Sequence, residues 1–362
     1  MTAIKALTAP VPPGGTIGIL GGGQLGRMLA MAAARLGLKT HIYSDENDAP
    51  AFQVCHARTH AHYENRESLS KFARACDAVT FEFENIPESA VSYLAGFKPT
   101  NPGAAALAPT QDRFLEKELV NGLGLRTAPY INVEAPEDVA EFARLGGAGI
   151  LKTRRFGYDG KGQAKVASVE EARGAFAAFK NAPAIVEGFV DFAFEASVIG
   201  ARGHDGSFAA YDPPENAHEH HILRRSTVPG RLTPRQGEEA RAIARRIADA
   251  LGHVGVLCVE LFVLGSGELL VNEIAPRVHN SGHWTVDACE VSQFEQHVRA
   301  VAGWPLGSPA RHSDAAMENI IGEEARDWQV LAARGGALHL YGKAEIRPGR
   351  KMGHITWLKN SR

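Results

Sequence analysis

Residues 255–285 decide the fold, and they read GVLCVELFVLGSGELLVNEIAPRVHNSGHWT. The glycines between the two apolar runs predict a hairpin, and a two-residue turn at 266–267 would place Glu260 opposite Glu273. A three-residue turn would place Asn272 there instead. Like charges that face each other raise the pKa of a carboxyl group unless a cation lies between them. The pattern therefore predicts a Mg²⁺ ion that bridges the acids to nucleotide phosphates, with salt bridges to arginines as the alternative.

A dense polar run, residues 276–284, follows the hairpin directly and is poorly suited to a protein core. Arg277 can hold an oxyanion through paired hydrogen bonds, and His279 can polarise a group or move a proton near neutral pH. Near the C-terminus, residues 347–354 read RPGRKMGH and form a second group of cations. This group suits a phosphate, and a solvated turn is the alternative.

A glycine-rich basic loop lies upstream, where residues 154–163 read RRFGYDGKGQ. Three glycines among cations suit a mobile loop that closes over a polyanion. Lys152, at the end of the preceding predicted strand, would point into the same cleft. The alternative is a flexible basic hairpin on the surface.

The N-terminal region predicts a parallel βαβ unit. The hydrophobic pattern gives a strand at 16–20, a helix at 24–36 and a second strand at 39–43, with the turn GGGQLG at 21–26. A GxGxxG turn followed by Asp45 suggests a dinucleotide-binding fold. Glycines at a helix N-terminus suit any phosphate, however, and a tight turn without a ligand is the remaining alternative.

Residues 80–85, TFEFEN, alternate strictly between apolar and polar side chains. Glu82 and Glu84 are therefore predicted to project from one face at the end of a strand, where open α/β sheets place their ligands. Two acids there could bind a ribose or an amine. A solvated strand face is the alternative.

Neither a zinc site nor a disulfide framework is expected. The four cysteines lie far apart and form no CxxC pair. Residues 218–221 read HEHH, but they follow two prolines in a predicted loop and lack the spacing of a helical zinc site.

The composition is that of an ordinary globular protein. The 362 residues include 39 Lys and Arg against 41 Asp and Glu, which gives a net charge of -2 and excludes a broad cationic surface for nucleic acid. No apolar run is long enough for a membrane span, and no secretory signal is recognisable at the N-terminus. We therefore expect a cytoplasmic protein that binds neither membranes nor nucleic acid.

The remaining pattern predicts alternating helices and strands. A helix is expected from an N-cap at Thr110 to about residue 122, a long helix at 234–251 and another at 293–302. Between the first two, the pattern predicts a small α+β region, with helices at 136–145 and 168–179 and strands at 149–152, 163–166 and 184–190. A strand at 78–83 would extend the N-terminal parallel sheet.

Five of these motifs together resemble the N5-carboxyaminoimidazole ribonucleotide synthetase family, ATP-grasp ligases of purine biosynthesis. They are GGGQLGRM, YDGKGQ, the hairpin with Glu260 and Asn272-Glu273, NEIAPRVHNSGHWT and RPGRKMGH, in order across residues 16–358. The resemblance implies an α/β and α+β ATP-grasp architecture. Its regions would be a doubly wound, Rossmann-like lobe at 1–109 that binds substrate phosphate, a lid region at 110–190, and a C-terminal mixed-sheet lobe at 191–362 with the metal and substrate residues.

The reaction implied by the resemblance joins ATP, bicarbonate and 5-aminoimidazole ribonucleotide to give N5-carboxyaminoimidazole ribonucleotide, ADP and phosphate. Bicarbonate would attack the γ-phosphorus of ATP to form carboxyphosphate. The resemblance also implies a homodimer. Carried over by position, the residues around ATP would be Arg113, Lys152, Gly157, Tyr158, Asp159, Gly160, Lys161, Gly162, Gln163, Glu187, Gly188, Phe189, Val190, Glu195, His218, Asn272 and Glu273.

The metal and substrate residues follow from the same resemblance. Glu260, Glu273 and Asn272 would hold two Mg²⁺ ions. The substrate would be bound by the amides of Gln24 and Leu25 at its phosphate, by Glu84 on the ribose side, and by Tyr158, Ser281, Arg350 and Lys351. The reaction centre would be lined by the catalytic residues Asp159, Lys161, Arg277, His279 and Lys351.

Two positions depart from the family pattern, and three other functions remain open. Phe156 precedes Gly157 where members often have a second glycine, and Lys161 stands where some have arginine. The alternatives are another ATP-grasp ligase that joins a carboxylate to an amine, an NAD-dependent dehydrogenase built on the GxGxxG turn, and a non-catalytic binding module.

Overall fold

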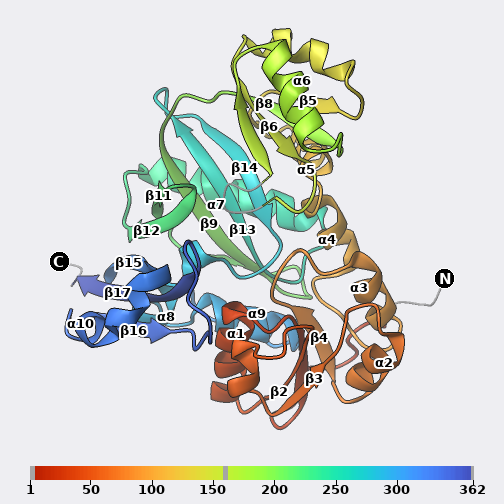
Figure 1. Ribbon diagram of the computed structural model, residues 1–362. Coiled ribbons are helices and arrows are strands. Elements are labelled where there is room, and N and C mark those ends of the chain that lie inside the picture. The colour runs from red at the N-terminus through yellow and green to blue at the C-terminus, as the bar shows by residue number, and fades with distance from the viewer. Residues whose placement is uncertain (1–4, 158–161, 360–362) are drawn as a thin grey trace.

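Three β-sheets organise the chain. The structure, a computed structural model, describes residues 5–157 and 162–359. Figure 1 shows the N-terminal lobe at the bottom, the lid sheet at the top and a large sheet between them. All strand pairs of the large sheet are antiparallel. The ATP-grasp architecture expected from the sequence is therefore confirmed, while the boundaries at 109 and 190 remain predictions.

The N-terminal lobe is a parallel four-stranded sheet in the order β3-β2-β1-β4. Its elements are β1 (Thr16–Leu20), α1 (Gln24–Arg35), β2 (Lys39–Ser44), η1 (Pro50–Gln53), β3 (Ala57–His60), α2 (Arg66–Arg74) and β4 (Ala78–Phe81). The predicted βαβ unit is confirmed. The strand expected at 78–83 is shorter, because β4 ends at Phe81.

Three helices lead from this lobe to the lid: α3 (Glu88–Ala95), α4 (Ala104–Thr110) and α5 (Arg113–Gly122). The helix expected to start at an N-cap at Thr110 begins later, because Thr110 ends α4 and Asp112 caps α5. The Asp112 carboxylate accepts hydrogen bonds from the amides of Phe114 and Leu115 at 3.0 and 3.3 Å.

The lid is an antiparallel sheet in the order β5-β8-β6-β7. It comprises β5 (Tyr130–Val133), η2 (Asp138–Leu145), β6 (Gly149–Thr153), β7 (Gln163–Val166), α6 (Val169–Ala178) and β8 (Ala184–Gly188). The predicted strands are present, and Ser168 caps α6. The helix expected at 136–145 is a 3₁₀ segment instead.

The large sheet has nine strands, ordered β14-β13-β9-β11-β12-β15-β17-β16, with β10 beside β9. The strands are β9 (Phe192–Arg202), β10 (Phe208–Ala210), β11 (Glu215–Glu219), β12 (Ile222–Val228), β13 (Gly255–Leu264), β14 (Leu269–Ala275), β15 (Asp314–Ile321), β16 (Ala337–Leu340) and β17 (Lys351–Lys359). The helical segments are α7 (Pro234–Ala250), η3 (Asn280–Gly282), α8 (Thr285–Ala288), α9 (Gln293–Val301), η4 (Gly322–Asp327) and α10 (Trp328–Ala332).

Helices α7 and α9 pack against strands β9 and β13 of the large sheet. A capping box between Thr233 and Gln236 starts α7, which buries Ile243 and Ile247 in a cluster with the apolar side chains of β9 and β13. Each such side chain stabilises the fold by about 1.5–3 kcal/mol. Helix α9 packs on β13 and α1, and its His297 is hydrogen-bonded to Thr80 of the N-terminal lobe at 2.7 Å. These contacts join the N-terminal lobe to the large sheet.

None of the helices in the described ranges could cross a membrane.

Candidate active site

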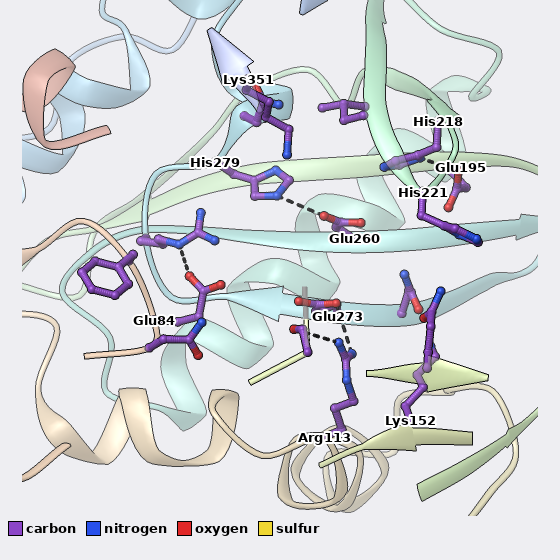
Figure 2. A pocket seen from close by; sticks show the side chains of 18 of the residues that line it. Glu84, Arg113, Lys152, Glu195, His218, His221, Glu260, Glu273, His279 and Lys351 are labelled. Carbon is purple, nitrogen blue, oxygen red and sulfur yellow. Dashed lines mark hydrogen bonds and ion pairs between the residues drawn. The ribbon is translucent and has the colours of Figure 1, made fainter. Parts of the chain in front are cut away.

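One cleft of about 990 Å³ collects side chains from the N-terminal lobe, the lid and the large sheet. Of the residues expected from the sequence, it is lined by Gln24, Leu25, Glu82, Glu84, Arg113, Lys152, Gly157, Gln163, Phe189, Glu195, His218, Glu260, Asn272, Glu273, Arg277, His279 and Lys351. Figure 2 shows the two acidic side chains of the hairpin in the middle of this cleft, on neighbouring strands.

Glu260 of β13 lies directly opposite Glu273 of β14, as predicted. The predicted two-residue turn is wrong, because Gly267 N donates to Leu264 O and Leu264 N to Glu268 O, which leaves a three-residue turn. A β-bulge next to Glu260 restores the register by leaving Asn272 without a partner residue on β13. The bulge explains why both Asn272 and Glu273 line the cleft.

Both acids have protein partners in this arrangement. His279 Nε2 lies 3.0 Å from a Glu260 carboxylate oxygen, and Arg113 Nη1 lies 3.3 Å from Glu273. The salt bridge to an arginine, which the sequence offered as the alternative to a bridging Mg²⁺, is therefore present at Glu273. Burial alone would raise the pKa of Glu260, but the hydrogen bond from His279 holds this pKa below its ordinary value. An ionised carboxylate next to a second acid is the state that attracts a cation.

The hairpin offers a donor set that fits Mg²⁺. Glu260, Glu273 and the side-chain amide of Asn272 present only hard oxygen atoms among the groups that could coordinate an ion, and all three are partly exposed to the cleft. Magnesium usually takes one or two carboxylates and completes its shell with phosphate and water. The chemistry of these residues therefore suits a magnesium–phosphate complex better than a closed zinc site.

A buried ion cluster joins the lid to α5. The Glu187 carboxylate lies 2.6 Å from Lys152 Nζ and 3.0 Å from Lys117 Nζ. Burial alone would raise the pKa of Glu187, but the two lysines outweigh it and lower the pKa to about 2. The amides of Gly188 and Phe189 donate to the carbonyl oxygens of Pro129 and Ala148.

An apolar wall and a polar pair lie at the lid end of the cleft. The rings of Phe192 and Phe262 stack with centroids 4.7 Å apart, and Phe189 is exposed beside them. His218 Nδ1 lies 2.7 Å from Glu195. His218 lies on β11 and not in the predicted loop. A flat ring bound here would contact phenylalanine faces, with carboxylate and imidazole groups in reach of hydroxyls.

The glycine turn forms the opposite end. Glu82 accepts hydrogen bonds from the amides of Gly23 at 2.6 Å and Gly26 at 2.8 Å, beneath the turn. Gln24 and Leu25 lie between these glycines and line the cleft. The prediction that Glu82 and Glu84 share a strand face is wrong, because the strand ends before them.

Glu84 has a separate role, since it pairs with Arg277 from the polar run after the hairpin. Burial alone would raise the pKa of Glu84, but the Arg277 charge lowers it to about 2. Figure 2 shows Glu84 in the same cleft as Glu260 and Glu273. The Glu84–Arg277 pair holds the N-terminal lobe to the large sheet across the cleft.

Family models match most of the chain. A ribonucleotide synthetase preATP-grasp domain matches residues 15–111, an ATP-grasp domain matches 118–294, and a phosphoribosylaminoimidazole carboxylase C-terminal domain matches 315–362. N5-carboxyaminoimidazole ribonucleotide synthase from Brucella melitensis is 52% identical over 96% of this chain and 97% of its own length. The chain belongs to the N5-carboxyaminoimidazole ribonucleotide synthase family.

Solved structures of the family agree closely with the fold. An ADP complex of N5-carboxyaminoimidazole ribonucleotide synthetase superposes with a TM-score of 0.93 at 41% identity, covering 98% of this chain and 95% of the other. The Aspergillus clavatus synthase in complex with ADP and 5-aminoimidazole ribonucleotide gives a TM-score of 0.88 at 30% identity, covering 96% and 95%. Membership of the synthase family leaves no support for the dehydrogenase alternative.

Several residues expected from the synthase family do not line the cleft. Ser281 is fully buried behind His279, and Arg350 Nη1 donates to Glu345 O outside the cleft. Neither residue lines the cleft in this arrangement, and their contacts with the substrate stay predictions. Glu187, Gly188, Gly162 and Val190 are also absent from the lining. Tyr158, Asp159, Gly160 and Lys161 lie outside the described residues.

Further lining residues were not anticipated as site residues. They are Glu46, Phe83, Asn85, Ile150, Lys165, Phe192, His220, His221, Leu223, Phe262 and Asn280. Phe262 follows Glu260 by two residues on a strand, so strand alternation alone places both on one face. No comparable local signal marks Glu46 or Leu223, which reach the cleft through the tertiary fold.

A histidine cluster away from the cleft does not form a second metal site. Ligand atoms of Asp287, His339 and His354 lie within 4.8 Å of one another. The rings of His339 and His354, however, stack 4.4 Å apart at an interplanar angle of 10°. Because the lone pairs of imidazole lie in the ring plane, those of the two histidines lie in nearly parallel planes and do not point at one common position. His339 bonds to Asp287 at 3.0 Å, so the cluster joins β16 and β17 to α8.

Proposed function

We propose that this chain catalyses the ATP-dependent carboxylation of 5-aminoimidazole ribonucleotide with bicarbonate. The products are N5-carboxyaminoimidazole ribonucleotide, ADP and phosphate, as part of purine biosynthesis. The observation that carries the proposal is the facing pair Glu260 and Glu273, which lies between a phenylalanine-lined end and a glycine-turn end of one cleft. A metal-bound triphosphate at one end could there meet a second anionic substrate at the other.

ATP is assigned to the lid end of the cleft. Adenine would lie against Phe189, Phe192 and Phe262, because these rings offer flat apolar faces. Glu195 suits the ribose hydroxyls, and Lys152 and Arg113 suit the phosphates. The ADP complex of a family member, named above, supports nucleotide binding by this chain.

The imidazole ribonucleotide is assigned to the glycine-turn end. The amides of Gln24 and Leu25 at the N-terminus of α1 would hold its phosphate, since a helix N-terminus attracts anions. Lys351, which lines the same cleft, and Glu84 would contact the ribose side. The Aspergillus clavatus complex contains 5-aminoimidazole ribonucleotide together with ADP, which supports a two-substrate cleft.

Magnesium would be held by Glu260, Glu273 and Asn272, and two ions are expected. When bound, it supplies charge neutralisation for the phosphates of ATP. The side chains of the cleft position the substrates. Arg113 and Lys152 orient the phosphates, and Arg277 and His279 present hydrogen-bond donors at the centre of the cleft.

The reaction divides into two transfers. A bicarbonate oxygen attacks the γ-phosphorus, the bond to the β-phosphate oxygen breaks, and ADP leaves carboxyphosphate behind. Carboxyphosphate releases phosphate and CO₂, and the exocyclic amine of the imidazole takes up CO₂ and loses a proton. The loop around Gly157 and Gln163 would close the cleft, because water would otherwise hydrolyse carboxyphosphate.

The proposed function is tested by ADP release with each substrate omitted in turn. We expect ADP formation to require bicarbonate and the imidazole ribonucleotide, and isotope from labelled bicarbonate to appear in the product. ADP formation that depends on a different carboxylate or amine would instead indicate another ATP-grasp ligase. Binding of ATP without turnover under any combination would indicate a binding module.

Glu82→Gln tests the support beneath the glycine turn. A glutamine has one acceptor oxygen where Glu82 has two, so the amide of Gly23 or Gly26 loses its partner and the turn shifts. We expect the KM for the imidazole ribonucleotide to rise about tenfold, since one charge-assisted hydrogen bond is lost. The KM for ATP should not change. Steady-state kinetics with each substrate varied would check this, and equal effects on both KM values would contradict it.

Two further expectations concern assembly and location: the first rests on the family resemblance, and the second on the sequence pattern. We propose that the protein acts as a homodimer and in the cytoplasm. Sedimentation of the purified protein and fractionation of cells that express it would test the two statements separately.

A further inference from the structure

A chain of buried polar groups lies behind His279. The Ser281 hydroxyl lies 2.9 Å from His279 Nδ1 and 2.7 Å from the Ser197 hydroxyl. Asn216 Nδ2 donates to Ser197 Oγ at 2.9 Å, and Ser226 Oγ donates to Asn216 Oδ1 at 2.7 Å. The three serines have 0% exposure and Asn216 has 6%. The chain therefore runs from the cleft into the large sheet without contact with solvent.

The protons along this chain point toward His279. The backbone amide of Ser281, which can only donate, bonds to Nδ1 at 3.3 Å. The geometry therefore makes Nδ1 an acceptor and leaves the proton of the imidazole on Nε2, which faces Glu260 at 3.0 Å. Burial lowers the pKa of His279, and the neighbouring Cys258 and Glu260 raise it, but the amide hydrogen that points at Nδ1 opposes a second ring proton there. At the other end, Asn216 donates to Ser197. The single proton of Ser197 is thus directed to Ser281, and that of Ser281 to Nδ1.

The surrounding backbone holds the chain in place. Ser197, Asn216 and Ser226 lie on β9, β11 and β12, which are neighbours in the sheet, and Ser197 is also opposite Glu260 in the register of β9 and β13. The buried side chain of Gln293 accepts from His279 N and donates to His279 O. His279 is thereby fixed at its backbone and at Nδ1.

We infer that Ser281, Ser197 and Asn216 are positioning residues that hold His279 in its Nε2–H tautomer, so that it donates to Glu260. The inference rests on the proposed function, in which Glu260 is a metal ligand. A donor on one oxygen of Glu260 leaves the other oxygen for the cation. Partners of this kind orient a metal site although they do not touch the ion.

Stability alone does not account for such a chain. Four polar side chains are buried in one continuous chain, where hydrocarbon side chains of the same size would avoid the desolvation of hydroxyl and amide groups. Each hydrogen bond from Ser226 to His279 Nδ1 is donated in the same direction along the chain. A network that orients His279 requires this consistent direction. Ser281 thus acts through His279 and does not contact the substrate.

Two variants interrupt the chain at different points. In Asn216→Asp, the carboxylate can only accept, so the Ser197 and Ser281 protons turn away from His279 and Nδ1 loses a donor. In Ser197→Ala, the chain is cut without a new charge. We expect kcat to fall about 10- to 100-fold in the first, as for other residues that orient metal ligands, and about tenfold in the second. The KM for ATP should stay unchanged in both.

The tautomer of His279 is the readout that a merely structural role would not move. In protein labelled with ¹⁵N-histidine, two-bond ¹H–¹⁵N correlations distinguish the Nε2–H from the Nδ1–H form, and comparison with His279→Asn identifies the signal. We expect wild-type protein to show the Nε2–H form and Asn216→Asp to gain the Nδ1–H form. This measurement needs neither metal nor substrate.

Thr356→Val serves as the matched control, because Thr356 carries a buried hydroxyl without a hydrogen-bond partner among the described residues. Its kcat should stay within about twofold of wild type. Folded Ser197→Ala and Asn216→Asp proteins with wild-type kcat and an unchanged His279 tautomer would overturn the inference. If Asn216→Asp does not fold, Ser197→Ala decides by the same two measurements. A wild-type protein that does not carboxylate the ribonucleotide would refute the proposed function but leave the tautomer test valid.

Discussion

Replacing Glu273 with glutamine is expected to abolish ADP formation at saturating ATP and Mg²⁺. The amide keeps the shape of the side chain but removes one of the two negative charges that face each other across the hairpin. Loss of a group that stabilises phosphoryl transfer lowers kcat on the order of 10²–10³-fold or more. Coupled ADP release, measured with increasing Mg²⁺, would show whether excess metal recovers any rate.

The fold should survive this substitution. Burial, together with the charge of Glu273, raises the pKa of the neighbouring Glu116, so removing that charge relieves a repulsion even as Arg113 loses its partner. We expect little change in thermal unfolding. Glu268→Gln is the control, since Glu268 lies at the exposed hairpin tip and pairs with Arg126. Full activity of Glu273→Gln, or equal losses in both variants, would contradict the metal role.

Arg277→Lys is expected to lower kcat/KM for the imidazole ribonucleotide by on the order of 10²-fold. The Arg277 guanidinium contacts Glu84 through Nε and donates from Nη1 to Val278 O at 3.0 Å. A lysine ammonium is a point charge and cannot make both contacts in this geometry. Because Glu84 loses part of its partner, the free energy of unfolding should fall by about 1.5–3 kcal/mol.

Arg231→Lys is the matched comparison, because Arg231 also pairs with a glutamate, Glu215, but at the surface. A surface pair contributes about 1 kcal/mol or less, so this variant should keep its activity and nearly all its stability. A double-mutant cycle with Glu84→Gln would separate the coupling energy of the Glu84–Arg277 pair from the other effects of Arg277. Additive losses in that cycle would mean that Glu84 and Arg277 do not act together.

The sequence predicted those helices and strands whose hydrophobic period and turn residues are clear within the element itself. The strand at Thr16–Leu20, the helix after the glycine turn and the strand at Gln163–Val166 follow from hydrophobic period and turn residues. The strands β11 and β12 were missed, because polar residues such as those of ENAHE and LRRS dilute the alternation. Their pairing depends on β9 and β15, which lie far away in the sequence.

The residues of the site also differ in whether the sequence alone could reveal their roles. Facing acids and a glycine turn were visible as motifs, and the structure brings them into one cleft. The roles of Glu82 and Ser281 were not visible, because each depends on a partner from another part of the fold, Gly26 for the first and Ser197 for the second. Residue type indicates what a side chain can bond to, but only the packed fold decides which bond is made.

The extra residue at position 272 changes how many ligands a single strand can supply. A regular strand turns every second side chain away from a given face, yet β14 directs two consecutive oxygen-bearing residues, Asn272 and Glu273, into the cleft. Deleting Asn272 would straighten the strand and still leave the acids facing each other, with one donor fewer. Such a shortened hairpin would separate the contribution of coordination number from that of charge, and it offers designers of metal sites a way to crowd ligands onto a sheet without adding a loop.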